Sequence, residues 1–153
     1  MRAVYLNGLM LLFLIFNSCT KDEIDDVKPV IDTSGALPAA CDTLRRGTDY
    51  VFKIKFSDNI ELGSFSIDIH HNFDQHSHST GSDFCVLDQK KTAVKPWTFI
   101  RAYEIPAGLK EFNATGIISI PKDIDQGDYH FWYKLTDKSG WQSLYGFSIK
   151  ILD

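Results

Sequence analysis

The sequence lacks the features that identify several large classes of protein. Among its 153 residues no apolar run reaches the roughly 20 residues that a membrane-spanning helix needs. The formal net charge is −4 and no long basic stretch occurs, which disfavours nucleic acid, because its binding depends on Lys and Arg that neutralise phosphates. A nucleophile elbow, a phosphate-binding loop, a dinucleotide fingerprint and the HExxH and CxxC zinc motifs are also absent. We therefore expect a protein that is not an enzyme and binds no nucleic acid.

Residues 1–18 are typical of a bacterial export signal. Arg2 supplies a positive charge, residues 3–16 form a short apolar segment, and a serine stands immediately before Cys19. A small residue before such a cysteine resembles a lipobox, in which the cysteine becomes the lipidated first residue. Two neighbouring positions depart from the usual lipobox, so cleavage elsewhere stays an alternative. We expect a lipoprotein signal peptide over residues 1–18 and a membrane anchor on Cys19.

An acidic stretch follows the predicted anchor. Residues 19–27 hold four acidic side chains and too few apolar ones to be buried, so we interpret them as a solvated tether. The stretch also resembles the acidic signal that sends lipoproteins of Bacteroidota to the outer face of the outer membrane, and a plain linker is the alternative. The sequence thus predicts an outer-membrane lipoprotein that is exposed on the cell surface.

Two cysteines remain for the exported domain. Cys41 and Cys85 are expected to form one disulfide, because thiols of exported domains are usually oxidised. The closed loop of roughly 45 residues would be worth about 3–4 kcal/mol. One alternative is that Cys85 serves as a thiolate ligand beside histidine, which would favour copper or zinc, and another is that both thiols are free.

The rest of the chain alternates short apolar runs with turn residues and shows no helical pattern. We expect seven strands, over residues 28–33, 49–56, 62–72, 97–105, 112–120, 129–135 and 147–151. A long polar loop, residues 73–95, follows the third of them. Seven short strands at regular spacing predict an all-β fold, an Ig-like antiparallel β-sandwich over residues 28–153.

Several segments resemble a known family. Gly127-Asp128-Tyr129 resembles the tyrosine corner of Ig-like domains. IPKDIDQGDYHFWYKLTDKSGWQS (residues 120–143) and SIDIHHNFDQHSH (residues 66–78), with Lys-Pro at residues 28–29, look like a family of Bacteroidota lipoproteins that carry an Ig-like domain of unknown function. The resemblance implies a fold and an outer-membrane location but no activity, so a site must be argued from the residues.

All histidines lie in two short segments: His70, His71, His76 and His78 in one, and His130 in the other. In an Ig-like sandwich the third and sixth strands are antiparallel neighbours, which brings the end of one close to the start of the other. Side-chain alternation places His70 and His130 on the outer face of that sheet. The loop that carries His76 and His78 leaves from the same end.

Neutral imidazole is a good ligand for transition metals. We therefore predict a surface site for a Zn or Cu ion formed by His70, His76, His78 and His130. Asp68, His71 and Asp74 are expected to serve as additional ligands or to orient the ligands from behind. The alternative is a polar loop whose histidines bind nothing.

Two further features leave alternatives open. Asp58, Asn59 and Asp137 lie in turns that should meet at the opposite end, where they cap backbone groups or supply oxygen ligands to Ca²⁺. Trp132 and Trp141 either pack or contact a glycan or protein. The chain is thus expected to be a surface metal-binding domain or, alternatively, an adhesion or accessory module for an envelope protein or a glycan.

Overall fold

The structure is a computed structural model that describes residues 24–76 and 85–153. Cys19 and His78 therefore lie outside the described residues. The strands are β1 (Val30–Leu37), β2 (Thr43–Arg45), β3 (Asp49–Ser57), β4 (Leu62–His71), β5 (Phe99–Glu104), β6 (Glu111–Ser119), β7 (Gly127–Asp137) and β8 (Gln142–Leu152). Within the described ranges there is no helix long and apolar enough to cross a membrane.

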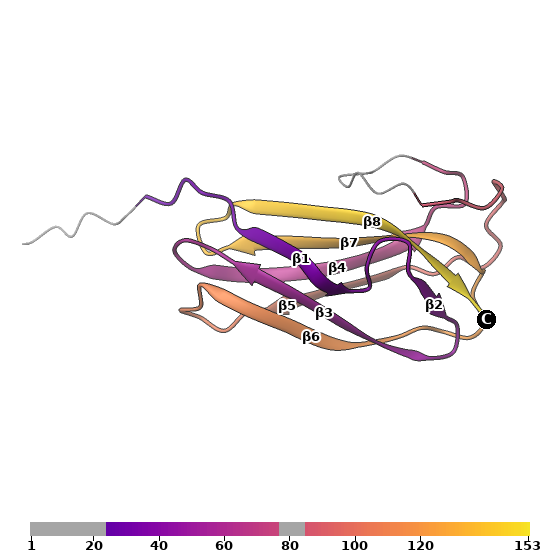
Figure 1. Cartoon of the computed structure of the whole chain (residues 1–153), viewed down its shortest axis with the longest axis horizontal. Coiled ribbons are helices and arrows are strands. Elements are labelled where there is room, and N and C mark those ends of the chain that lie inside the picture. The colour runs from indigo at the N-terminus through magenta and orange to yellow at the C-terminus, as the bar shows by residue number, and fades with distance from the viewer. Residues whose placement is uncertain (1–23, 77–84) are drawn as a thin grey trace, which may run out of the picture.

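The strands form two sheets that face each other (Figure 1). The smaller sheet has the order β1-β3-β6, and the larger has the order β2-β8-β7-β4-β5. Neighbouring strands are antiparallel, except that β2 runs parallel to β8. This arrangement confirms the predicted all-β sandwich.

Period-two alternation decides which side chains lie between the sheets. Phe52, Ile54 and Phe56 of β3 are buried, and the intervening Val51 and Lys53 are exposed. β4 and β7 turn their apolar faces toward them, and the core is lined by rings and branched side chains that include Phe65, Ile67, Ile69, Phe131, Tyr133 and Leu135. At the start of β7 the Tyr129 hydroxyl donates to the Asp125 carbonyl at 2.7 Å, the contact expected of a tyrosine corner.

The predicted strand boundaries differ from the structure at β1, β5, β7 and β8, and β2 is an additional strand. β1 begins at Val30 rather than Lys28 and continues to Leu37, with a register shift where it leaves regular pairing with β3. β5 begins at Phe99, two positions later than predicted. β7 extends two residues beyond each predicted end, and β8 begins at Gln142, five positions earlier than predicted. β2 was not predicted at all, because three residues are too few to show an alternation; its Leu44 is buried and its backbone pairs with β8.

The sandwich has two distinct ends (Figure 1). One end carries the β3–β4 turn, the β7–β8 turn and the segment that enters β1. The other end carries the last residues of β4, the first residues of β7 and the C-terminus. Histidines lie at the second of these ends, and a group of aspartates lies at the first.

Candidate functional site

The histidine end is built on the pairing of β4 with β7. His70 lies directly opposite His130 in the register, and their ring centroids are 5.4 Å apart. On its other side His130 lies opposite Ser148 of β8. The structure therefore brings together the two histidines that are most distant in sequence.

The loop after β4 brings a third histidine, His76, next to this pair. The Asn72 amide donates to the Asp128 carbonyl at 2.8 Å, and Gln75 takes a left-handed backbone conformation with φ of 55°. This turn places the His76 ring nearly parallel to that of His70, with centroids 5.7 Å apart. The His76 ring is also 5.1 Å from that of His130. His70, His76 and His130 form what we call the histidine cluster.

A carboxylate orients each of the two more exposed rings. Nδ1 of His70 lies 2.8 Å from Oδ1 of Asp68, and Nδ1 of His76 lies 2.5 Å from Oδ1 of Asp74. The hydrogen bond with His76 is the main cause that lowers the pKa of Asp74, so this carboxylate is charged at neutral pH. An Nδ1–H that donates to a carboxylate fixes the tautomer in which Nε2 carries the lone pair that a metal would bind.

His130 is buried rather than exposed at the surface. It is 6% exposed, whereas the side chains of His70 and His76 are 26% and 29% exposed. The predicted surface position is therefore wrong for His130. The reason is that the loop after β4 folds over it, with Nε2 of His130 3.2 Å from the His76 carbonyl oxygen.

The histidine cluster is wider than a closed metal site. In the described ranges, the group of three His, Cys, Asp or Glu ligand atoms found within 4.8 Å of one another is a set of aspartates, not the histidines. His71 lies at the border of the cluster, with its ring 4.9 Å from Phe73 and 6.4 Å from His76, and its Nδ1 is buried without a hydrogen-bond partner. A closed site at this end needs inward movement of the rings or a further ligand.

A disulfide lies beside the histidine cluster. Cys41 and Cys85 are bonded, with Cα atoms 5.3 Å apart, and the Cys41 amide donates to the Ser148 carbonyl at 2.8 Å. Because Ser148 pairs with His130, the disulfide is fixed next to the buried histidine. The sulfur of Cys85 is thus held in a disulfide and is not a thiolate ligand.

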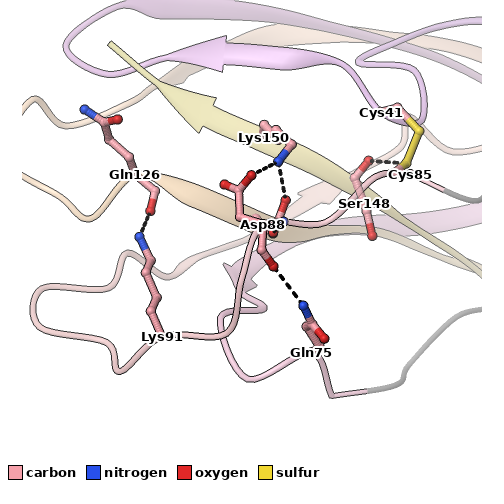
Figure 2. A network of polar contacts seen from close by, with 9 residues as sticks. Cys41, Gln75, Cys85, Asp88, Lys91, Gln126, Ser148 and Lys150 are labelled. Carbon is pink, nitrogen blue, oxygen red and sulfur yellow. Dashed lines mark hydrogen bonds and ion pairs between the residues drawn. A yellow bond between two sulfur atoms is a disulfide. The ribbon is translucent and has the colours of Figure 1, made fainter.

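Polar contacts fasten the segment that follows Cys85 to the sheet (Figure 2). Lys150 of β8 pairs with Asp88, and the side chain of Gln75 donates to the Asp88 carbonyl at 2.8 Å. The Asp88 amide donates to the buried carboxylate of Asp128 at 2.7 Å. Lys91 donates to the Gln126 carbonyl farther along. The backbone that carries His76 is thereby tied to β8 through Gln75 and Asp88.

Three aspartates meet at the opposite end of the sandwich. One carboxylate oxygen from each of Asp25, Asp58 and Asp137 lies within 4.8 Å of the others. Gly63 lets the start of β4 lie close to the end of β7, because a Cβ there would lie 2.7 Å from the Asp137 carbonyl oxygen. The turns were expected to bring Asp58 and Asp137 together, but Asp25 was missed, since its acidic neighbours indicate a solvated tether.

The two turns hold Asp25 against the domain. The indole Nε1 of Trp141 donates to the Asp25 carbonyl at 2.9 Å, and the Asn59 side chain donates to Oδ1 of Asp25 at 3.2 Å. Desolvation raises the pKa of Asp25, but hydrogen bonds from Val27, Asn59 and Ser139 together outweigh it and lower the pKa overall. The carboxylate is therefore ionised at neutral pH.

The two tryptophans proposed as a contact for a glycan or protein have structural neighbours. The Trp132 ring covers Gly146, since a Cβ at that position would come within 2.5 Å of it. Trp141 is 42% exposed, but its indole nitrogen is used by the Asp25 carbonyl. Both residues thus contribute to packing or to holding the N-terminal segment.

A family model described as a domain of unknown function (DUF4625) matches residues 17–152. The match spans both the histidine cluster and the three aspartates. No curated protein matches the chain. The predicted resemblance to a family with a domain of unknown function is confirmed at this level.

Proposed function

Because the chain belongs to the DUF4625 family, which is defined as a domain of unknown function, we propose a function from the chain's own residues. The protein is a non-catalytic, lipid-anchored Ig-like domain on the surface of the outer membrane. It captures a transition-metal ion, Zn or Cu, at the histidine cluster. Capture would serve sensing of the metal or its delivery to an envelope partner.

The observation that carries the proposal is the convergence of three imidazoles from separate parts of the chain. β4, β7 and the loop after β4 each contribute one ring, and the centroids are 5.1–5.7 Å apart. Two of the rings have their Nδ1 atoms against carboxylates, an arrangement typical of histidines that bind a metal through Nε2. A metal would draw the nitrogens inward, and His78 is the fourth ligand of the proposal.

The proposed location rests on the N-terminal residues. A short apolar segment, residues 3–16, lies just before Cys19, and an acidic stretch separates that cysteine from the sandwich. Two or more acyl chains on Cys19 would give a stable anchor, whereas a single chain would bind only marginally. The acidic stretch supports the proposed export to the outer face.

We expect the full-length chain, purified without a histidine tag, to bind about one Zn²⁺ or Cu²⁺ at neutral pH and to release it by about pH 5. Protons compete with the metal near the ordinary imidazole pKa of about 6.5. The His76→Ala/His78→Ala double variant should lose most of the bound metal. Elemental analysis after dialysis at each pH gives the metal content.

The His71→Ala variant is the matched comparison for this experiment. Its ring packs on Phe73 and lies farther from His76 than the other two rings do, so the variant should keep the metal content of the parent. Equal metal in the His76→Ala/His78→Ala variant and the parent would show that the histidine cluster is not the site. A parent chain without bound metal would contradict the proposed function itself.

We expect the Asp68→Asn variant to bind the same metal about tenfold more weakly. The change keeps a hydrogen-bond acceptor for His70 Nδ1 but removes the charge that makes the ring a better ligand, an effect of about 10–100-fold in other metal sites. A competition titration with a chromophoric chelator measures the affinity. Asp32→Asn, on β1 in the other sheet, should leave it unchanged, and an equal loss in both variants would rule out an orienting role for Asp68.

A further inference from the structure

The aspartate end joins three separate segments of the chain. Asp25 belongs to the segment before β1, Asp58 to the β3–β4 turn, and Asp137 to the last position of β7. One carboxylate oxygen from each lies within 4.8 Å of the other two. Three negative charges at such distances repel one another unless something lies between them.

Each of these carboxylates uses one oxygen within the protein and leaves the other without a partner. Oδ2 of Asp58 accepts two amides of its own turn at 2.8 Å, and Oδ1 of Asp137 accepts the Trp141 amide at 2.9 Å. Oδ1 of Asp25 accepts from Asn59. The unused oxygens are Oδ2 of Asp25, Oδ1 of Asp58 and Oδ2 of Asp137, all of them buried. Hydrogen bonds within the turns therefore account for only one of the two oxygens of each carboxylate.

The burial of Asp137 is a second, independent observation that points to a cation at this end. Asp137 is 4% exposed, and its unused Oδ2 has neither a hydrogen bond nor an ion pair. No Lys, Arg or His in the described part of the chain forms an ion pair with any of the three aspartates. A buried carboxylate is costly unless a cation or a hydrogen bond compensates its charge.

We propose that Asp25, Asp58 and Asp137 bind a Ca²⁺ ion. Carboxylate oxygens are hard ligands that suit Ca²⁺ or Mg²⁺ rather than the softer transition metals. Ca²⁺ binds its ligands at about 2.3–2.6 Å, so oxygens up to about 5 Å apart can share one ion, whereas Mg²⁺ at about 2.0–2.1 Å spans only about 4 Å. The oxygens, which lie within 4.8 Å of one another, match the wider span.

The bound ion clasps the N-terminal segment to the sandwich. Without Ca²⁺ the segment is held near Asp25 by contacts with Trp141, Asn59 and Ser139, and the repulsion among the carboxylates opposes that docking. With Ca²⁺ the repulsion becomes attraction. Because Asp25 lies between Cys19 and β1, the ion would also shorten the stretch of chain between the domain and a lipid anchor. This consequence rests on the proposed function, whereas the calcium site itself does not.

The test compares the thermal unfolding of the full-length chain in chelator and in about 10 mM CaCl₂, well above the 10⁻⁴–10⁻³ M dissociation constants of extracellular calcium modules. We expect Ca²⁺ to raise Tm by roughly 5–10 °C, and Mg²⁺ to raise it less. The shift should vanish in Asp25→Asn, a half-buried position whose change should not prevent folding. In chelator this variant should be at least as stable as the parent, because it has lost repulsion.

Asp26→Asn is the matched control, since Asp26 is exposed, adjacent and of the same charge. It should keep the full Ca²⁺ shift. Tb³⁺ provides a second readout, because the indole of Trp141 is close enough to sensitise its luminescence, and Ca²⁺ should displace it. No Ca²⁺ shift in the parent, or an equal shift in Asp25→Asn and the parent, would overturn the site.

The two proposed metal sites can fail separately. Asp25→Asn should keep the Zn²⁺ or Cu²⁺ content of the parent, and His76→Ala/His78→Ala should keep the Ca²⁺ shift. Loss of transition metal alone would affect the proposed function and leave the calcium site intact. Loss of the Ca²⁺ shift alone would do the reverse.

Discussion

Replacing Phe56 by alanine should lower the free energy of unfolding by about 3–5 kcal/mol, the range for truncating a buried aromatic ring. Phe56 belongs to β3 of the smaller sheet, and its fully buried side chain packs against the larger sheet. Its ring centroid lies 5.0 Å from that of Phe65 in β4 and 6.3 Å from that of Tyr133 in β7. The variant loses contacts between the sheets and leaves a cavity that both sheets must close.

Urea unfolding at neutral pH, followed by tryptophan fluorescence, measures this change. Val51→Thr is the matched control, because Val51 lies on the opposite face of the same strand and is 54% exposed. Its β-branched replacement should change the stability by no more than about 0.5 kcal/mol. If Phe56→Ala cost as little as the control, the two sheets would not pack through this ring.

The histidine pair could be predicted because strand pairing follows simple rules. Alternation places His70 and His130 on one face, and antiparallel neighbours bring the end of β4 to the start of β7. The burial of His130 could not be predicted in the same way. It depends on the loop after β4, whose path is set by the left-handed backbone of Gln75 and its contact with Asp88.

The aspartate end shows a different limit of sequence reasoning. Turn chemistry identifies Asp58 and Asp137, since each caps its own turn. Asp25 lies in a stretch whose composition indicates a solvated tether, and composition carries no information on what Trp141 and Asn59 hold in place. The position of Asp25 is therefore set by tertiary contacts between residues more than a hundred positions apart, such as the bond from Trp141 to its carbonyl.

The two ends of the sandwich offer different kinds of metal-binding atoms. The histidine cluster offers imidazole nitrogens, which suit Zn or Cu, and the aspartate end offers oxygens alone, which suit Ca²⁺. A sandwich keeps such sites apart because its strands run the length of the domain between them (Figure 1). Each site is built where turns and loops meet, and the rigid sheets between them hold β4 and β7 in register at both ends.

Removing the disulfide should lower the free energy of unfolding by about 3–4 kcal/mol. Cys41 and Cys85 are separated by 44 positions, and their bond restricts the unfolded chain over that whole loop. In the folded state, the contacts of Asp88 with Lys150 and of Asp88 with Asp128 can still hold the segment after Cys85. The Cys41→Ser/Cys85→Ser variant should therefore fold, with a lower midpoint in urea.

Cys19→Ser provides the reference chain, since it carries the same type of substitution and leaves the disulfide in place. All variants are made in that background, so that no free thiol can exchange. Hydrogen exchange gives a second readout: the amides of Asp88 and Lys91 should exchange faster in the variant, and the β3–β6 pairs should change only by the global loss. A loss below about 1 kcal/mol would mean that the unfolded chain gains little freedom when this loop is opened.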